Sequence, residues 1–205
     1  MKFKLIATAA LLGFMSFSAP SFATAAVGSA APAFSLTDTA GKTVSLADFK
    51  GKHVVLEWIN PGCPYVQKHY VIANMQATQK GAVDKGVVWL AINTTAKDHV
   101  DYKAPAAMAA WMSEQKAAAS ATLMDSSGLA GRAYSARTTP QMFVINPAGT
   151  IVYAGAIDNK RSANPADVKG ATNHVSAALA ETLAGKPVTV AATQSYGCSV
   201  KYSSM

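Results

Sequence analysis

The hydrophobic pattern of the chain predicts an α/β domain. Two runs, 54–59 and 87–92, are almost continuously apolar, which is typical of parallel strands covered on both faces. A third apolar run, 142–145, is followed by a four-residue turn containing Pro and Gly and by a further apolar run, 150–153, so two paired strands are expected there. Strands that alternate with amphipathic segments indicate a mixed sheet with helices packed on it.

The segments between these strands predict three helices. The expected ranges are 64–80, 105–118 and 165–184. The third helix is rich in alanine and is followed by Gly185, which favours a helix C-terminus at that point. Nearer the N-terminus, 34–36 and 43–45 flank a glycine-containing turn and predict a β-hairpin.

The first residues of the chain have the pattern of a secretory signal peptide. Lys2 and Lys4 precede an apolar segment, 5–17, and small residues follow up to Ala25, where cleavage is expected. The apolar segment is too short to span a bilayer, and no later stretch reaches about 18 apolar residues. We therefore expect a periplasmic or secreted protein without membrane insertion after cleavage. The predicted organisation is a signal peptide at 1–25, one domain at 26–185 and an extended tail at 186–205.

The charge of the chain gives no indication of nucleic-acid binding. The formal net charge is +7, and it falls to +5 when the two lysines of the signal peptide are removed. The remaining basic residues are scattered, with only Lys160 and Arg161 adjacent, and aromatic residues do not interleave with a basic stripe. Nucleic acid is therefore excluded from the expected partners.

Cys63 stands at a predicted strand-to-helix corner, directly after the run 54–59 and before Pro64. Proline fits the first position of a helix, because its missing N–H costs nothing there, so Cys63 is expected at the helix cap. The unpaired N–H groups and the positive dipole end of a helix favour a thiolate, and the placement therefore predicts a reactive cysteine. The alternative is a buried thiol that only packs as a small hydrophobe.

Three features carry a resemblance to a known family. They are the strand–Cys63–Pro64–helix corner, Thr139-Pro140 directly before a strand, and the glycine-containing hairpin after that strand. With these features, residues 26–185 resemble the thioredoxin-fold redoxins, which include thioredoxins and the alkyl hydroperoxide reductase/thiol-specific antioxidant proteins. The segment 57–70 is most similar to exported peroxiredoxin-like redoxins, which also carry a C-terminal Gly-Cys-Ser-Val-Lys-Tyr segment, here 197–202.

The resemblance implies a thioredoxin-like α/β fold, with a mixed central sheet flanked by helices on both faces and an N-terminal β-hairpin. It also implies an antioxidant thiol oxidoreductase with Cys63 as nucleophile. Thioredoxins have a second cysteine three residues later, where this chain has Val66, so a resolving thiol has to come from elsewhere. The residues that orient peroxide in peroxiredoxins are replaced here by Leu56, Asn60 and Pro140, which disfavours efficient peroxidase chemistry.

The same resemblance assigns roles to further residues. Glu57 lies six residues before Cys63, where thioredoxins keep a buried acid, and we expect burial to raise its pKa and make it a proton acceptor. The alternative is a Glu that reaches solvent beyond a sheet edge. Thr139-Pro140 resembles the cis-proline loop that faces the cysteine, and its backbone is expected to pair with an extended substrate; the alternative is an ordinary strand-initiating proline. The predicted substrate-contacting residues are Thr139, Pro140, Pro64, Tyr65, Asn60 and Trp58. For the two aromatic residues among them, the alternative is simple core packing.

Cys198 is the second cysteine of the chain and the predicted resolving partner. The 13 positions from Gly185 to Cys198 let an extended chain reach more than about 40 Å, enough to return to the Cys63 corner. Cys63 would attack a disulfide or an oxidant, and Cys198 would resolve the product. The alternative is a permanent Cys63–Cys198 disulfide, which stabilises a fold by about 4–5 kcal/mol in the chain-entropy model.

The sequence thus predicts an exported thiol-disulfide oxidoreductase, with a thiol-dependent peroxidase as its variant. The other class that stays open is a non-catalytic exported binding or scaffold domain with a structural disulfide. The expected partners are protein or small-molecule thiols and disulfides, peroxides in the peroxidase variant, and an unidentified reductant. Neither a cofactor nor a metal is predicted, because the histidines lack metal-ligand spacing. His69, which a helix would turn away from Cys63, is expected to be a surface or packing residue.

Overall fold

The computed structural model describes residues 25–203, so the predicted signal peptide lies outside the described residues except for Ala25. Seven strands form one sheet. They are β1 Ser35–Asp38, β2 Thr43–Ser45, β3 Val54–Trp58, β4 Val88–Asn93, β5 Ala121–Met124, β7 Gln141–Ile145 and β8 Ile151–Gly155. Their order is β2-β1-β5-β4-β3-β7-β8. β3, β4 and β5 are parallel and the other pairs are antiparallel, so the sheet is mixed, as predicted.

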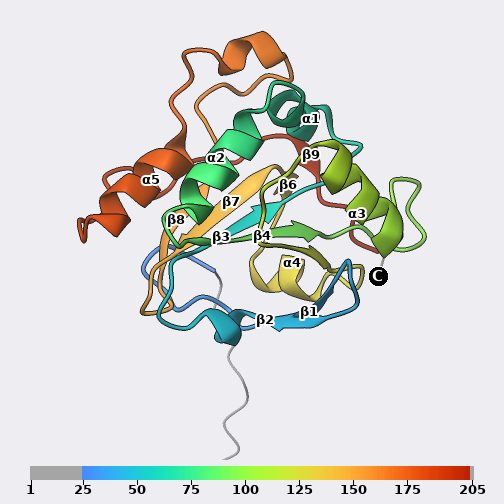
Figure 1. Cartoon of the computed structure of the whole chain (residues 1–205), viewed down its shortest axis with the longest axis horizontal. Coiled ribbons are helices and arrows are strands. Elements are labelled where there is room, and N and C mark those ends of the chain that lie inside the picture. Colours follow the sequence, from blue (N-terminus) through green and yellow to red (C-terminus); the bar gives the residue numbers. More distant parts are fainter. Residues whose placement is uncertain (1–24, 204–205) are drawn as a thin grey trace, which may run out of the picture.

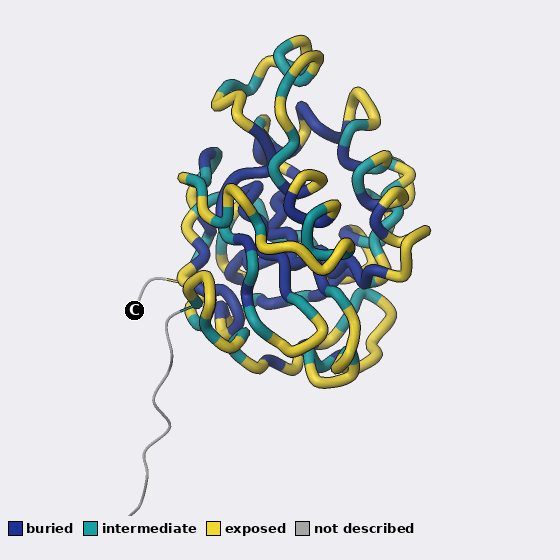
Figure 2. The backbone as a smooth tube through the Cα atoms, turned by 90° about the vertical axis from the view of Figure 1, so that its left-hand side faces the viewer, coloured by how far each residue is buried: buried dark blue, intermediate teal, exposed yellow. Residues whose placement is uncertain are grey.

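The two predicted buried strands occupy the centre of this sheet. All five residues of β3 and all six of β4 are buried, because other elements cover both faces (Figure 2). Side chains alternate along a strand, so Val55 and Ile59 enter one hydrophobic core whereas Leu56 and Trp58 enter another. Each face of the sheet therefore has its own core.

Helices cover both faces, which confirms the predicted thioredoxin-like α/β fold. The helical elements are α1 Pro64–Val71, α2 Asn74–Val83, α3 Pro105–Glu114, α4 Leu129–Ala133, α5 His174–Leu183 and the 3-10 turns η1 Leu46–Phe49 and η2 Pro165–Val168. α1, α2, α3 and α5 pack on the face of Val55, and α4 packs on the face of Leu56, where side chains of the β1–β2 hairpin join the same core (Figure 1). Among residues 25–203, no helix is long and apolar enough to cross a bilayer.

The predicted helix 64–80 is two helices, α1 and α2. Between them, Ala73 adopts a left-handed conformation with φ of 59°, which ends the helical geometry. The Tyr70 carbonyl accepts hydrogen bonds from the Ala73 N–H and from the Gln76 side chain, so it is not available to continue the helix. The prediction of one helix was wrong because the left-handed residue and these local hydrogen bonds end α1 before α2 begins.

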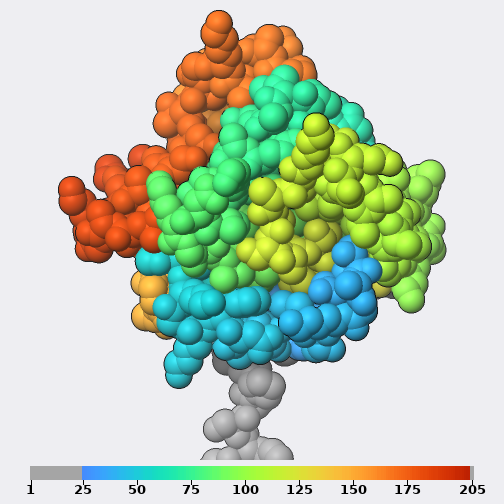
Figure 3. Space-filling view, viewed as in Figure 1, coloured from blue at the N-terminus to red at the C-terminus, as the bar shows by residue number. Residues whose placement is uncertain are grey.

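The predicted helix 165–184 is interrupted as well. Its first part forms only η2, Gly170 has a φ of 81°, and α5 starts after Asn173, whose side chain accepts a hydrogen bond from the Ser176 N–H. Asn173 is thus an N-cap inside the predicted helix, and a cap of this kind starts a new helix. The segment around η2 projects beyond α1 (Figure 3).

The remaining differences lie between β4 and β7. The helix predicted at 105–118 ends at Glu114, because Lys116 takes a left-handed conformation with φ of 54°. β5 and α4 have no counterpart among the predicted elements. They contain four and five residues, which is too short for a periodic pattern to stand out.

The C-terminal tail lies extended along the domain. In the edge strand β8, the Ala154 N–H donates a hydrogen bond to the Ala191 carbonyl, and the Ala154 carbonyl accepts one from the Thr193 N–H. The tail then reaches β9, Cys198–Ser199, which pairs antiparallel with β6, Thr138–Thr139, in a separate two-stranded sheet (Figure 1). The tail therefore returns to the loop before β7, next to the start of α1.

Candidate thiol site

Cys63 occupies the N-cap of α1, with Pro64 at the first helical position. Its backbone carbonyl accepts a hydrogen bond from the Gln67 N–H, and its own N–H donates to the Asn60 carbonyl. The Cys63 side chain is only 2% exposed. Its Sγ donates a 3.0 Å hydrogen bond to the carbonyl oxygen of Thr139 in β6. The thiol is therefore held against the loop that precedes β7.

Thr139 and Pro140 form the loop that faces this thiol. The peptide bond between them is cis, as the resemblance implied. Both residues are buried, and Thr139 pairs in antiparallel register with Cys198. The backbone edge that was expected to pair with a substrate is thus occupied by the chain's own tail.

Gly197 permits this close pairing. Its φ is 127°, a conformation that residues with a Cβ rarely adopt, and a Cβ at this position would lie 2.0 Å from the Thr139 carbonyl oxygen. The same oxygen accepts the hydrogen bond from Cys63 Sγ. A glycine directly before Cys198 therefore lets the tail approach the thiol corner.

Cys198 is half-buried and packs against the core that contains Cys63. Both cysteines are free thiols. Burial, a hydrogen bond with Cys63 and the proximity of its charge raise the pKa of the Cys198 thiol well above its ordinary value. At neutral pH, Cys198 is therefore a protonated thiol held beside Cys63, so the fold brings together two cysteines that are far apart in the sequence.

Four buried polar residues, Lys68, His69, Asp158 and Tyr196, fix the tail two positions before Cys198; we call them the tyrosine cluster. Each is at most 5% exposed. The Tyr196 hydroxyl donates to Asp158 Oδ1, and His69 Nε2 lies 3.4 Å from the same hydroxyl. Lys68 Nζ lies 4.9 Å from the centre of the Tyr196 ring. Burial lowers the pKa of His69 to about 4, so this histidine is a neutral packing residue at neutral pH.

Glu57 is the fourth residue of β3 and is completely buried, so it does not reach solvent. Its carboxylate accepts hydrogen bonds from Tyr70 Oη at 3.0 Å, Gln79 Nε2 at 2.9 Å and Trp89 Nε1 at 2.7 Å. Burial raises the pKa of Glu57 to about 7, although these three hydrogen bonds act in the opposite direction. Within residues 25–203, none of its hydrogen bonds goes to either cysteine. Burial and the raised pKa agree with the expectation, and the role of proton acceptor stays a prediction.

The raised pKa makes Glu57 a pH-dependent element of stability. Between its ordinary value of 4.5 and about 7, Glu57 is protonated in the folded chain and ionised in the unfolded chain. The folded state then binds more protons, so stability falls as the pH rises through this window, by about 3 kcal/mol in total. His69 has the opposite sign: its pKa is lowered from 6.5 to about 4, and stability rises with pH over that range.

The Asn60 side chain shapes the turn that presents the thiol. Its Oδ1 accepts a 2.7 Å hydrogen bond from the Gly62 N–H, and its Nδ2 lies 3.4 Å from Thr95 Oγ1. The residue is 3% exposed. Both ends of the amide are therefore engaged within the protein, whereas the sequence had suggested that it contacts the substrate.

Two of the other predicted contact residues lie on the first turn of α1. Pro64 is exposed and Tyr65 is half-buried, with its ring edge-on to Tyr196 at a centroid distance of 6.0 Å. Tyr65 therefore borders the tyrosine cluster, next to the thiol corner.

Trp58 lies on the opposite face of the sheet from Cys63. It is completely buried in the core of α4 and the hairpin, in contact with Tyr134 and Phe143, and its Nε1 donates to Thr94 Oγ1. The expectation that Trp58 contacts the substrate is therefore corrected. Alternation along β3 places it with Leu56 and not with the thiol, so core packing is its role.

The tyrosine cluster, Gly197 and the hydrogen-bond donors to Glu57 were not predicted from the sequence. A glycine next to Cys198 is a visible signal, because a glycine often marks a close approach of two backbone segments. Tyr65 and Lys68 are three positions apart on α1 and share one helix face. Asp158 lies in a loop without any periodic pattern, so no sequence signal pointed to it.

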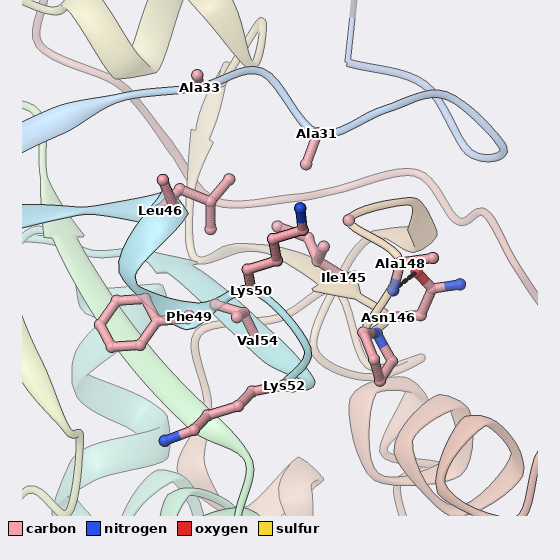
Figure 4. A pocket seen from close by; sticks show the side chains of 13 residues that line it. Ala31, Ala33, Leu46, Phe49, Lys50, Lys52, Val54, Ile145, Asn146 and Ala148 are labelled. Carbon is pink, nitrogen blue, oxygen red and sulfur yellow. Dashed lines mark hydrogen bonds between the residues drawn. The ribbon is translucent and has the colours of Figure 1, made fainter.

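The described part of the chain has several cavities outside the contacts of Cys63. One, of about 270 Å³, is lined mainly by apolar residues, with Lys50, Lys52 and Asn146 as its polar side chains, and Figure 4 shows the Lys52 side chain extending away from the other lining residues. It includes Val54 at the start of β3, the end of that strand remote from Cys63. A second, of about 410 Å³, adjoins the thiol corner at Gly62. In the described part of the chain, no group of three or more His, Cys, Asp and Glu side chains is placed to hold a metal ion.

Comparisons with known proteins bear on the class of this site. The model of the AhpC/TSA family matches residues 27–154. The chain is 29% identical over 133 residues to the thiol-disulfide oxidoreductase ResA of Bacillus subtilis (strain 168), a match that covers 61% of this chain and 64% of that protein. The chain thus spans less than two thirds of the length of this curated relative.

Among solved structures, the chain is similar to an uncharacterized conserved protein from Geobacillus kaustophilus. The TM-score is 0.76 and the identity 26%, with 89% of this chain and 95% of the other covered. It is also similar to the thioredoxin domain of a thiol-disulfide oxidoreductase from Bacteroides vulgatus, with a TM-score of 0.50, 25% identity, and coverage of 71% of this chain and 96% of that one.

Proposed function

The chain belongs to the AhpC/TSA family, and from this premise we propose that it is a thiol-disulfide oxidoreductase in which Cys63 is the nucleophile and Cys198 the resolving thiol. The observation that carries the proposal is the pairing of Thr139 with Cys198, which brings the tail cysteine against the Cys63 thiol at the start of α1. The substrate class is a disulfide of a protein or a small molecule.

The reaction consists of two exchanges. The Cys63 thiolate attacks one sulfur of the partner disulfide, a mixed disulfide forms, and the other partner sulfur leaves as a thiolate that takes up a proton. The Cys198 thiol then loses its proton and attacks Cys63 Sγ, so that the Cys63–Cys198 disulfide forms and the second partner sulfur is released. Two electrons pass from this chain to the partner, and an external dithiol restores the two thiols.

The protonation states support this order of steps. Cys198 has a pKa well above its ordinary value and stays a thiol at neutral pH, so it does not compete with Cys63 for the first attack. Glu57 is our proposed proton acceptor for the thiol pair, because its pKa of about 7 lets it take up a proton near neutral pH.

The test uses three full-length chains: wild type, Cys63→Ser and Cys198→Ser. Each reduced chain is mixed with oxidised glutathione and analysed by mass spectrometry under non-reducing conditions. We expect an intramolecular disulfide in the wild type, a stable glutathione adduct on Cys63 in Cys198→Ser, and no Cys63 chemistry in Cys63→Ser. Absence of any adduct on Cys63 in the Cys198→Ser chain would refute Cys63 as the nucleophile.

We propose disulfide exchange in preference to peroxide reduction because of Asn60. Its amide is engaged with Gly62 and Thr95 and is not free to orient a peroxide. Peroxide consumption by the wild type and by Cys63→Ser, with a dithiol reductant, measures this directly. We expect little difference between the two chains, and rapid turnover that depends on Cys63 would favour the peroxidase variant.

The competing class is a binding or scaffold domain in which a permanent Cys63–Cys198 disulfide only staples the tail. The reduction potential of the pair distinguishes the two classes. A potential below about −300 mV marks a structural bond that resists the glutathione pool, whereas a higher potential marks an exchanging one. We expect the higher potential, because the proposed function requires a bond that exchanges with partner thiols.

We further propose that residues 1–25 direct export to the periplasm or the cell exterior, that 26–185 form the redoxin domain and that 186–205 act as its tail. N-terminal sequencing of protein recovered from a host that carries out signal cleavage tests this arrangement. The mature chain is expected to begin at Ala26, and an intact N-terminus would contradict the proposal.

A further inference from the structure

Cys63 is covered by the tail, so a partner has to take the place of the tail before it reacts. The thiol is 2% exposed, and its neighbours are the Thr139 carbonyl and Cys198. A mixed disulfide between Cys63 and a partner cysteine has the same covalent geometry as the Cys63–Cys198 disulfide. The partner cysteine therefore occupies the position of Cys198, and the residues before it follow the path of the tail along β6.

The tail shows what fits along this path. The residue before the cysteine is Gly197, and any Cβ there would lie 2.0 Å from the Thr139 carbonyl oxygen. The residue two positions before the cysteine is Tyr196, whose ring contacts Tyr65 and the Lys68 ammonium group, both on α1. Its hydroxyl donates to Asp158.

The surroundings of Tyr196 form a built site for a phenol side chain. Asp158 is 2% exposed, and its Oδ1 accepts from the Tyr196 hydroxyl and from the Lys160 N–H. Its Oδ2 accepts no hydrogen bond within residues 25–203 and lies 3.8 Å from His69 Nε2. Lys68 Nζ is 3.9 Å from Asp158 Oδ1 and donates to the Lys160 carbonyl. The charged wall of the site thus comes from α1 and the Asp158 loop, and only the aromatic ring comes from the tail.

The polar lining of this site is better suited to a ligand that binds and leaves than to a permanently packed core. Burying a carboxylate and an ammonium group is expensive, and apolar side chains of similar size often stabilise a fold more. Charged groups that are uncovered when the tail lifts are hydrated, whereas apolar ones would be left exposed to water. The tail remains anchored on both sides of this segment, by Thr193 to β8 and by Val200 to the Arg137 carbonyl, so a local lift of the residues between these anchors opens the site.

We propose that the tyrosine cluster is a recognition site for a tyrosine of the partner, located two residues before the partner's reactive cysteine and separated from it by glycine. The substrate class is therefore a protein disulfide or thiol in an extended Tyr-Gly-Cys segment, and the tail segment 196–198 is its internal competitor. This proposal rests on the proposed function, because it requires Cys63 to form mixed disulfides.

The test uses the full-length Cys198→Ser chain, with and without Tyr196→Ala. Both are mixed with peptides of sequence SYGCS, SFGCS, SAGCS and SYACS, each carrying 5-thio-2-nitrobenzoate on its cysteine. Release of the chromophore gives the rate, and mass spectrometry shows whether the peptide is on Cys63. We expect SYGCS to react about tenfold faster than SAGCS, with SFGCS between them, because the hydroxyl binds a charged acceptor. SYACS is expected to react more slowly than SYGCS, because its Cβ meets the Thr139 carbonyl.

A pocket variant and a matched control make the comparison specific. Asp158→Ala in the Cys198→Ser chain removes the oxygen that accepts the hydroxyl and is expected to abolish the preference for SYGCS over SFGCS, whereas Asp84→Ala, at an exposed ion pair with Lys80, is expected to keep it. The readout is a ratio of rates within one protein, so a loss of stability in the variant does not imitate the result. If Tyr196→Ala prevents folding, the peptide order in the Cys198→Ser chain decides alone.

The outcomes separate the two proposals. Equal rates for all four peptides, with adducts on Cys63, would overturn the recognition site and leave the oxidoreductase function intact. If no peptide forms an adduct on Cys63, the proposed function fails and this inference fails with it. A preference for tyrosine that persists in Asp158→Ala would also overturn the site, since the hydroxyl would then be recognised elsewhere.

Discussion

The substitution Gly197→Ala tests how the tail positions its cysteine. An added Cβ would lie 2.0 Å from the Thr139 carbonyl oxygen and 2.8 Å from its carbonyl carbon, and the φ of 127° is unfavourable for alanine in any case. The reduced chain relieves this strain by releasing the tail. The oxidised chain cannot do so, because the Cys63–Cys198 bond holds the tail in place, so the strain falls on the oxidised form alone.

The size of the effect follows from the strain of one residue in a sparsely populated backbone region, about 1–3 kcal/mol. The equilibrium constant for forming the disulfide should therefore fall by about 5- to 150-fold. For a two-electron couple this raises the reduction potential by about 20–65 mV. Equilibration with glutathione buffers, followed by alkylation and mass spectrometry, measures the potential of each chain.

Gly185→Ala is the matched control. Gly185 also has a positive φ, of 70°, but an added Cβ would meet nothing within 4 Å. This variant should lose about 1–2 kcal/mol of stability through backbone strain while its potential stays that of the wild type. A Gly197→Ala potential equal to that of the wild type would refute the close approach of the tail to Thr139.

Two further predictions concern the sheet beneath the thiol site. Glu57→Gln should remove the fall in stability between about pH 4.5 and 7. The difference in unfolding free energy between wild type and variant, measured with urea at several pH values, should therefore change by about 3 kcal/mol across this window. A constant difference would contradict the raised pKa, and taking the difference cancels the opposite contribution of His69. Trp58→Phe should lower stability by about 1–3 kcal/mol, because the indole N–H bond to Thr94 and part of the core packing are lost. The rate of Cys63 reaction with oxidised glutathione should be unchanged in this variant, and a large change would place Trp58 at the thiol site after all.

Much of the fold could be predicted because its central strands have a strong signal. Apart from Glu57, the runs 54–59 and 87–92 are apolar on both faces, a pattern typical of covered parallel strands. The breaks in the predicted helices were missed because single residues set them. Ala73 adopts a left-handed conformation that alanine seldom takes, and Asn173 caps α5 inside an alanine-rich segment, so neither break shows in the hydrophobic period.

The candidate site also contains residues that the sequence identifies and residues that only the structure reveals. Cys63 and Pro140 lie at corners whose local sequence is distinctive, and Cys198 is identified as a possible partner because the chain has only two cysteines. Trp58 was predicted to contact the substrate, with core packing as the alternative, and alternation along β3 turns it to the face opposite Cys63. Asp158 had no signal at all, because its meeting with Tyr196 joins a loop and the tail across 38 positions.

The sequence by itself determined that Cys63 stands at a strand-to-helix corner after a buried strand and that any second thiol of this chain has to come from the C-terminal tail. These conclusions depend on local rules: the period of apolar residues, the place of proline in a helix and the count of cysteines. Only the tertiary structure decided that the tail occupies the edge of β6, that Gly197 lets it come close, and that a buried cluster holds Tyr196. Such contacts depend on packing between distant segments. They cannot be predicted from the sequence because burial, and the distance between two backbone segments, are properties of the folded chain.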